Sequence, residues 1–228
     1  MKRILFIGNS YTYYNEMPFE IFKKMAESVG LDIDVSAVTK GGESLVGHST
    51  EGHETYDKIN LLFENEKFDY VILQEQSDTP AVNREKYFTG LEHFVSVARR
   101  NGAEPIIYGT WPKKEGHPNL EKFGVDRKTM AKMLDEAFAA AGEKFGIQVS
   151  YTSPCFDAIE KSEELVDLYN ADRSHPSYAG SFTAALCLLN TVLDVDPMSV
   201  KFGGNLTCKQ ADMIKTVVGE CVKKADKC

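Results

Sequence analysis

The sequence contains no long hydrophobic run, and the motifs that most directly indicate nucleotide binding are missing. Its apolar N-terminal stretch, residues 4–7, is followed by the polar Asn9 and Ser10, which end it far short of a signal-peptide core or a membrane span. We therefore expect no membrane association. Neither the Gly-x-Gly-x-x-Gly pattern nor the Walker A pattern occurs, so no nucleotide or other cofactor is expected.

Cysteine and metal-ligand patterns are also weak. The 5 cysteines are odd in number and contain no Cys-x-x-Cys pair, which is typical of reduced thiols in a cytoplasmic protein. Cys208, Cys221 and Cys228 lie too far apart for a zinc ribbon. His48 and His53 lack the spacing of zinc-protease ligands. These observations predict a cytoplasmic protein without a metal site.

The chain lacks an excess of positive charge. Lys and Arg number 26 against 34 Asp and Glu, which gives a formal net charge of −8 and a sequence pI of about 5.2. Such a chain repels phosphate backbones unless a local basic patch overrides its overall field, and its basic residues are scattered. Nucleic-acid binding is therefore not expected.

What remains is the composition of a globular protein with a sizeable core, at 43% hydrophobic and 26% charged residues. A length of 228 residues lies within the range of one α/β domain, and neither an internal repeat nor an interdomain linker is visible. We interpret residues 1–228 as a single domain.

Short apolar runs alternate with longer segments of helical period, which indicates a parallel sheet covered by helices on both faces. The predicted strands are residues 4–7, 33–37, 70–73, 105–109 and 147–151. The predicted helices carry apolar stripes of period 3.6 and span residues 17–29, 87–100, 126–145, 177–193 and 209–222. We therefore predict a three-layer α/β/α sandwich with a five-stranded parallel sheet. Ligands of such sheets bind outside the carboxyl ends of the strands.

Two segments at that edge could carry chemistry. Residues 8–12, Gly-Asn-Ser-Tyr-Thr, follow the first strand and place the Ser10 hydroxyl at the approach to a helix. This serine can be a nucleophile, or it can serve only as a turn or cap residue. Residues 172–176, Asp-Arg-Ser-His-Pro, precede a helical segment far along the chain. Asp172 can orient His175 as the base of a Ser–His–Asp device, although this pattern alone also fits a capping Asp beside a surface His.

Four motifs follow one another along the chain: Gly-Asn-Ser after strand one, a Gly-rich turn after strand two, a polar loop after strand three and a late Asp-x-x-His. In this order they resemble the four blocks of SGNH (GDSL-like) serine hydrolases. The resemblance implies the flavodoxin-like SGNH hydrolase fold. It also implies a catalytic triad of Ser10, Asp172 and His175. Where the family usually has Gly-Asp-Ser, Asn9 replaces the acid, which keeps Ser10 and removes a charge beside it.

In this family the oxyanion hole combines the amide of the first-block Ser, the amide of a second-block Gly and a third-block side-chain amide. The resemblance implies the Ser10 amide and, within residues 41–45, the Gly42 amide. The third block, residues 74–78, reads Gln-Glu-Gln-Ser-Asp instead of the usual Gly-x-Asn-Asp, and resembles a segment of sialate and xylan O-acetylesterase-like members. Gln can donate the same amide N–H as Asn. Gln74, at the end of the strand, is therefore the predicted third donor, with Gln76 as the alternative.

The resemblance implies hydrolysis of a small-molecule carboxylic ester through an acyl-enzyme on Ser10. Acetyl is the expected acyl group, and a carbohydrate is one candidate for the alcohol. Two alternatives stay open: a lipase- or thioesterase-like member that takes longer acyl chains, and a flavodoxin-like binding module that has lost catalysis. Trp111, which follows the fourth strand, either lines the cleft or packs at its rim.

Overall fold

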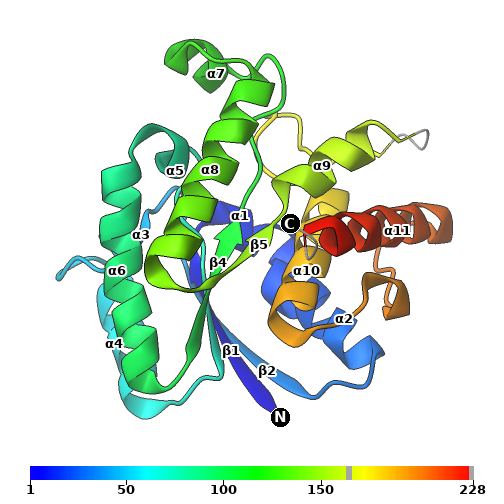
Figure 1. The fold of residues 1–228 in the computed structure, drawn as a ribbon. Helices are drawn as coiled ribbons and strands as arrows, with labels where there is room; N and C mark the ends of the chain where they lie inside the picture. The colour runs from blue at the N-terminus through cyan, green and yellow to red at the C-terminus, as the bar shows by residue number, and fades with distance from the viewer. Residues whose placement is uncertain (163–165, 226–228) are drawn as a thin grey trace.

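The computed structural model describes residues 1–162 and 166–225, so that Cys228 lies outside the described residues (Figure 1). Its centre is a five-stranded sheet with the order β2-β1-β3-β4-β5, in which every pairing is parallel. The strands are β1 (Lys2–Gly8), β2 (Ile33–Thr39), β3 (Tyr70–Leu73), β4 (Glu104–Gly109) and β5 (Gln148–Tyr151). The predicted five-stranded parallel sheet is confirmed.

Helices cover both faces of this sheet. The main ones are α2 (Lys23–Ser28), α4 (Tyr56–Asn65), α6 (Arg84–Asn101), α8 (Arg127–Phe145), α9 (Ser153–Glu160), α10 (Tyr178–Leu193) and α11 (Cys208–Ala225). The other helical segments are α1 (Ser10–Tyr13), η1 (Tyr14–Glu16), η2 (Met17–Phe22), α3 (Leu45–His48), α5 (Thr79–Val82), α7 (Pro118–Phe123) and η3 (Pro197–Ser199). In Figure 1, α4, α6 and α8 lie on one side of the sheet, and α2, α10 and α11 lie on the other.

The central strand β1 shows why the strands are apolar at successive positions. Ile4 and Phe6 belong to the core shared with α2, α10 and α11, whereas Leu5 and Ile7 belong to the core shared with α6 and α8. All four side chains are fully buried. Neighbouring side chains of a strand point to opposite faces, so a strand between two helical layers needs an apolar residue at every position.

Helices α4 and α9 have no counterpart among the predicted segments. In α4 only Ile59 is fully buried, with Leu62 and Phe63 partly buried beside it, and Leu61 is 56% exposed, so the apolar stripe of this 10-residue helix spans little more than one turn. Helix α9 has 8 residues, and its pattern is too short to show a period. Neither helix contributes the residues of the candidate site.

The loop between α9 and α10 folds back on itself before α10 begins. Tyr169 and Pro176 form an antiparallel bridge, and the amide of Asn170 donates to the carbonyl of His175 at 2.8 Å. This hairpin places residues 172–175 at the carboxyl edge of the sheet, where the loops after β1, β2, β3 and β4 also lie.

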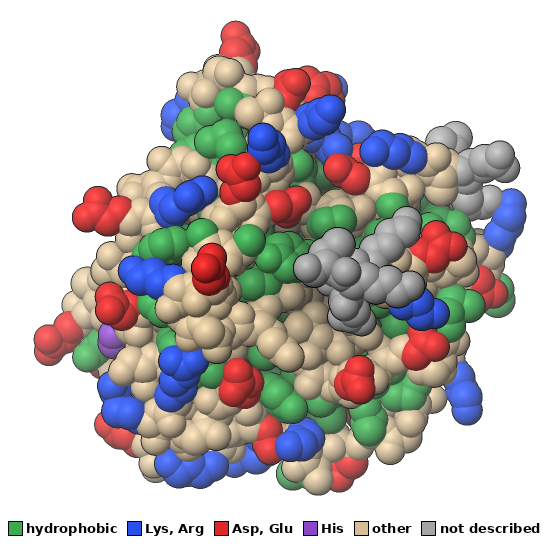
Figure 2. Space-filling view, in the orientation of Figure 1, with side chains coloured by type: hydrophobic (Ala, Val, Ile, Leu, Met, Phe, Trp, Pro, Cys, Tyr) green, Lys and Arg blue, Asp and Glu red, His purple; other side chains and the backbone are tan. Residues whose placement is uncertain are grey.

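The surface gives two further observations. Among residues 1–162 and 166–225, no helix combines the length and the hydrophobicity that a membrane span requires. On the face shown in Figure 2, acidic and basic side chains are interspersed. This mixture agrees with the scattered basic residues of the sequence.

Candidate active site

Ser10 is the first residue of α1, directly after β1. The cap of this helix is Asn9, whose side-chain oxygen accepts the amide of Tyr11 at 3.1 Å. Ser10 is therefore not the capping residue of this helix. An amide in the first turn of a helix has no carbonyl partner within that helix. The hydroxyl and the amide of Ser10 are thus both available at the pocket that this residue lines.

His175 connects Ser10 to Asp172, as the sequence predicts. Its Nε2 lies 2.8 Å from Ser10 Oγ, and its Nδ1 lies 2.5 Å from Asp172 Oδ2. The other carboxylate oxygen, Oδ1, accepts the amides of Ser174 and His175, both at 2.9 Å. These amide bonds fix the carboxylate against the ring, so Asp172 orients the imidazole through the local turn.

The environment of Asp172 keeps it ionised. Burial acts to raise its pKa, but hydrogen bonds from the His175 ring and from the Ser174 and His175 amides outweigh burial, and the pKa lies below its usual value. A carboxylate at Nδ1 selects the neutral tautomer that carries hydrogen on Nδ1. The lone pair of Nε2 then faces the Ser10 hydroxyl, which is the arrangement required of a general base.

Aromatic rings hold the imidazole from two sides. The ring of Tyr14 stacks on His175 with centroids 4.4 Å apart and an angle of 10°, and Tyr11 meets it edge-on at 5.7 Å. Tyr11 in turn stacks on Trp111, and Trp111 stacks on Phe156. Trp111 is 1% exposed and does not line the pocket, so it contributes to the site by packing against Tyr11.

Gly42 lies in the turn after β2 and lines the same pocket as Ser10. Its φ of +69° is in the left-handed region that favours glycine. A Cβ at this position would meet no atom within 4 Å, so the backbone conformation, and not crowding within the protein, accounts for the glycine. Asn9 Nδ2 donates to the carbonyl of Glu43 at 2.8 Å and so ties this turn to the Ser10 turn.

Contrary to the prediction, Gln74 does not line the pocket that Ser10 and Gly42 share. Its side chain is fully buried beneath the turn after β1. Its Oε1 accepts the amide of Asn9 at 2.8 Å and the hydroxyl of Thr12 at 2.9 Å, and its Nε2 donates to the carbonyl of Glu75. The amide of Gln74 donates to the carbonyl of Ile7 in β1, so the backbone pairing continues one residue beyond β3. The direction of the Gln74 side chain is therefore still set by its place in the strand. It braces the turn that carries Ser10.

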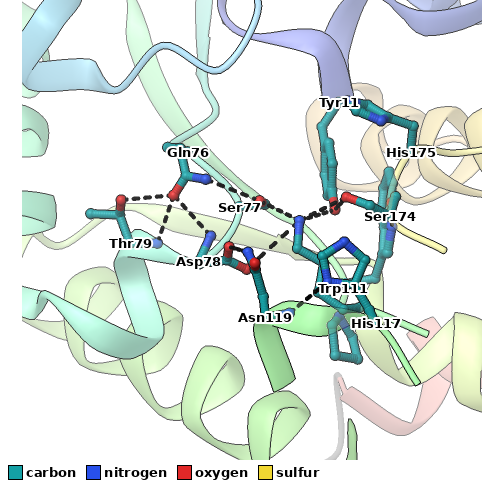
Figure 3. Close-up of polar contacts among 12 residues, drawn as sticks. Tyr11, Gln76, Ser77, Asp78, Thr79, Trp111, His117, Asn119, Ser174 and His175 are labelled. Atoms are coloured by element: carbon teal, nitrogen blue, oxygen red, sulfur yellow. Dashed lines mark hydrogen bonds and ion pairs between the residues drawn. The ribbon is translucent and has the colours of Figure 1, made fainter. Parts of the chain in front are cut away.

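Gln76 is the glutamine that lines the pocket, together with Ser10 and Gly42. Its Oε1 accepts the amides of Asp78 and Thr79, both at 3.1 Å, and the Thr79 hydroxyl at 3.0 Å (Figure 3). These three bonds orient the amide group, and one N–H of Nε2 donates to Ser77 Oγ at 3.3 Å. The second N–H remains for a ligand. The alternative donor of the third block is therefore the one that fits.

Glu75 links the second and third blocks from behind the pocket. It is 3% exposed, and its carboxylate accepts the amide of Gln76 at 2.6 Å and the amide of Leu45, at the start of α3, at 3.3 Å. Burial raises the pKa of Glu75 to about 7, although the two amides oppose the shift.

We expect Glu75→Gln to gain stability relative to the wild type as the pH rises. Because the folded-state pKa of about 7 lies above the ordinary value of 4.5, the folded protein holds this proton more tightly than the unfolded chain. The stabilisation from Glu75 is present below pH 4.5 and is lost as the pH rises through 7. Between pH 5 and pH 8, the unfolding free energy of Glu75→Gln minus that of the wild type should therefore increase by about 2 kcal/mol.

Urea denaturation of both proteins at the two pH values measures this difference. Glu104→Gln, at an exposed glutamate that begins β4, is the matched control and should show no such movement. A difference between wild type and Glu75→Gln that stays constant with pH would contradict the prediction.

The complete pocket has a volume of about 380 Å³ and includes side chains that the sequence interpretation missed. These are Tyr13, Tyr14, Ser77, Lys113 and Ser174. What these residues share is their position, because each lies in a loop or a short helical turn at the carboxyl edge of the sheet. Lys113 is 4% exposed, which sequence reasoning does not anticipate, since lysine in a loop is usually solvated.

Known structures contain the same architecture. A candidate SGNH hydrolase from Slackia heliotrinireducens is 35% identical, with a TM-score of 0.74 over 83% of this chain and 98% of that chain. The chain belongs to the SGNH hydrolase family. This confirms the resemblance found in the four sequence blocks, the predicted fold and the prediction of a hydrolase.

Two more distant structures share the SGNH hydrolase fold with this chain. A DUF4886 family protein from Bacteroides uniformis has a TM-score of 0.83 at 16% identity, over 99% of this chain and 96% of that chain. A variant of an acetylxylan esterase from Geobacillus stearothermophilus has a TM-score of 0.57 at 16% identity, over 83% and 93%. No family model matches the sequence, and no curated protein sequence does.

Proposed function

We propose that this SGNH hydrolase cleaves carboxylic esters through an acyl-enzyme on Ser10. The observation that carries the proposal is the continuous hydrogen-bonded line from Ser10 through His175 to Asp172, with contacts of 2.8 and 2.5 Å. A serine beside a neutral imidazole that is held by a carboxylate is the arrangement of an activated nucleophile. A binding module without catalysis would not need this alignment.

The reaction follows from the positions of these groups. His175 accepts the hydroxyl proton as Ser10 Oγ attacks the ester carbonyl carbon, and Asp172 stabilises the resulting imidazolium. The amides of Ser10 and Gly42 and the Nε2 of Gln76 donate to the oxyanion. The tetrahedral intermediate collapses, and His175 protonates the departing alcohol. A water molecule, deprotonated by His175, then attacks the acyl-enzyme, and the carboxylic acid leaves as His175 returns the proton to Ser10 Oγ.

The pocket supports a small acyl group over a long hydrocarbon chain. Its volume is about 380 Å³, and Ser77, Lys113 and Ser174 are part of its wall. An alkyl chain placed against these groups would displace their hydration without offering a hydrogen bond in return. We propose acetyl as the acyl group, which the resemblance of residues 74–78 to O-acetylesterases also implies. The polar wall disfavours the lipase- or thioesterase-like alternative.

We further propose that the alcohol is a carbohydrate. Tyr13, which is 41% exposed, and Tyr14 both line the pocket, and flat aromatic rings can pack against a sugar ring. The acetylxylan esterase among the fold neighbours gives additional support. Ester substrates built on acetylated sugars are therefore the first natural candidates.

A series of p-nitrophenyl esters from acetate to octanoate tests this proposal. We expect kcat/KM to be highest for acetate and to fall by about tenfold or more at octanoate, because the added methylenes meet a polar wall. The common leaving group keeps the intrinsic reactivity similar along the series. A kcat/KM that rises with chain length would contradict the short-acyl proposal, and the absence of turnover for every ester would contradict the esterase proposal.

A further inference from the structure

Lys113 is buried in the wall of the pocket among hydroxyl groups from three separate segments. Its Nζ lies 2.9 Å from the hydroxyl of Tyr11, 2.8 Å from Ser77 Oγ and 2.7 Å from Ser174 Oγ. In Figure 3 these three hydroxyls converge between the loop of Gln76 and the loop of His175. A lysine that is 4% exposed is uncommon, and none of the catalytic steps proposed above uses it.

A count of hydrogens shows what this cluster offers to a ligand. The ammonium has three N–H groups, and all three are used by the three hydroxyl oxygens. Ser77 Oγ also accepts an N–H of Gln76, so its own hydrogen is left to donate. The hydroxyls of Tyr11 and Ser174 are 2.9 Å apart and share one hydrogen, which leaves a second O–H. Within the described part of the chain, neither remaining hydrogen has an acceptor.

These two O–H groups are strengthened as donors by the cation. A hydroxyl that accepts a hydrogen bond from an ammonium is polarised, and its own hydrogen becomes a better donor. Ser77, Ser174 and Tyr11 all line the same pocket as Ser10, so both donors can meet a bound ester. The complement to a pair of donors is an oxygen atom with free lone pairs.

The charge of the cluster favours a neutral partner. Asp78 Oδ1 lies 3.7 Å from Lys113 Nζ, and Asp78 is 6% exposed. The carboxylate also accepts Asn119 Nδ2 at 2.6 Å, which holds it in place. The buried ammonium is therefore already paired with a buried carboxylate, and an anionic ligand would gain little from it.

We propose that Ser77 and the Tyr11–Ser174 pair, polarised by Lys113, form a subsite for a neutral oxygen acceptor of the substrate. The acceptor is an ether, hydroxyl or carbonyl oxygen outside the reacting ester group. The subsite selects oxygen-bearing esters over hydrocarbon esters of the same size. This inference rests on the proposed esterase function and defines the substrate class of the same pocket.

Two matched pairs of esters test the subsite on both sides of the reacting bond. In the acyl pair, p-nitrophenyl methoxyacetate is compared with p-nitrophenyl butyrate. In the alcohol pair, 2-methoxyethyl acetate is compared with butyl acetate by titration of the released acid. Within each pair an ether oxygen replaces one methylene, so size is conserved. The measured quantity is the ratio of kcat/KM for the oxygenated ester to that for the hydrocarbon ester.

The ratio is compared between the wild type, Ser77→Ala and Lys113→Met, because intrinsic ester reactivity then cancels. We expect it to fall by about tenfold in both variants for one of the two pairs, as the loss of a polarised hydrogen bond predicts. The affected pair shows whether the oxygen belongs to the acyl group or to the alcohol. Lys114→Met is the control with an unchanged ratio, since Lys114 Nζ contacts Asp167 outside the pocket.

The possible failures can be told apart. If the wild type hydrolyses the esters but neither ratio changes in Ser77→Ala or Lys113→Met, the subsite is overturned and the esterase function stands. If the wild type hydrolyses none of the esters, the proposed function fails and the subsite fails with it. Should Lys113→Met not fold, Ser77→Ala decides alone, because it removes one hydroxyl and leaves the Lys113–Asp78 pair intact.

Discussion

Ser10→Ala will lower kcat/KM for p-nitrophenyl acetate by about 10⁴-fold or more and will leave the free energy of unfolding almost unchanged. Without Oγ no acyl-enzyme can form, and His175 loses the group whose proton it accepts. The fold keeps its local support because the cap of α1 comes from Asn9, which is not altered. Initial rates and urea denaturation measure the two quantities.

A fluorophosphonate probe provides an independent readout of the same prediction, because only an activated serine reacts with it efficiently. The wild type should be labelled, and Ser10→Ala should not. Ser199→Ala, at an exposed serine in η3, is the matched control and should be labelled like the wild type. Labelling of Ser10→Ala at the wild-type rate would show that the nucleophile is another residue.

Gln76→Ala should reduce kcat by about 10²- to 10³-fold with little change in KM, because a donor to the oxyanion strengthens as negative charge develops on the carbonyl oxygen. The substitution removes Nε2 from the pocket. It also releases the amides of Asp78 and Thr79, so circular dichroism and thermal unfolding should accompany the kinetics.

Gln74→Ala is the paired variant and should act mainly on stability. It leaves the amide of Asn9 and the hydroxyl of Thr12 without their buried acceptor, which should cost about 1–3 kcal/mol of unfolding free energy. A folded Gln76→Ala enzyme with wild-type kcat would contradict the assignment of the third donor, whatever the effect of Gln74→Ala.

The contrast between these two glutamines shows where sequence reasoning stops. The sheet and the positions of Ser10, Asp172 and His175 were predictable because each depends on a local pattern placed at the end of a strand or at the entrance to a helix. The choice between Gln74 and Gln76 depends on where the chain leaves the sheet after β3. One additional residue paired with β1 turned Gln74 inward, and no local pattern encodes that pairing.

The burial of Lys113 was unpredictable for a different reason. Its partners Tyr11, Ser77 and Ser174 come from the first, third and last of the blocks, and each is unremarkable in its own segment. A buried lysine is tolerated only when all of its partners are in place. The sequence therefore contains the residues of the subsite without a local sign that they meet.

The bond between Ser10 and His175 joins residues 165 positions apart in the chain. A contact of such separation forms only after the intervening chain has folded together. The packing of α10 on the rest of the fold offsets the loop-closure entropy that this contact costs. During synthesis the N-terminal part emerges from the ribosome first. A nascent chain that ends before the Tyr169–Pro176 hairpin carries the nucleophile without its base, so hydrolytic competence arises only after His175 has been synthesised.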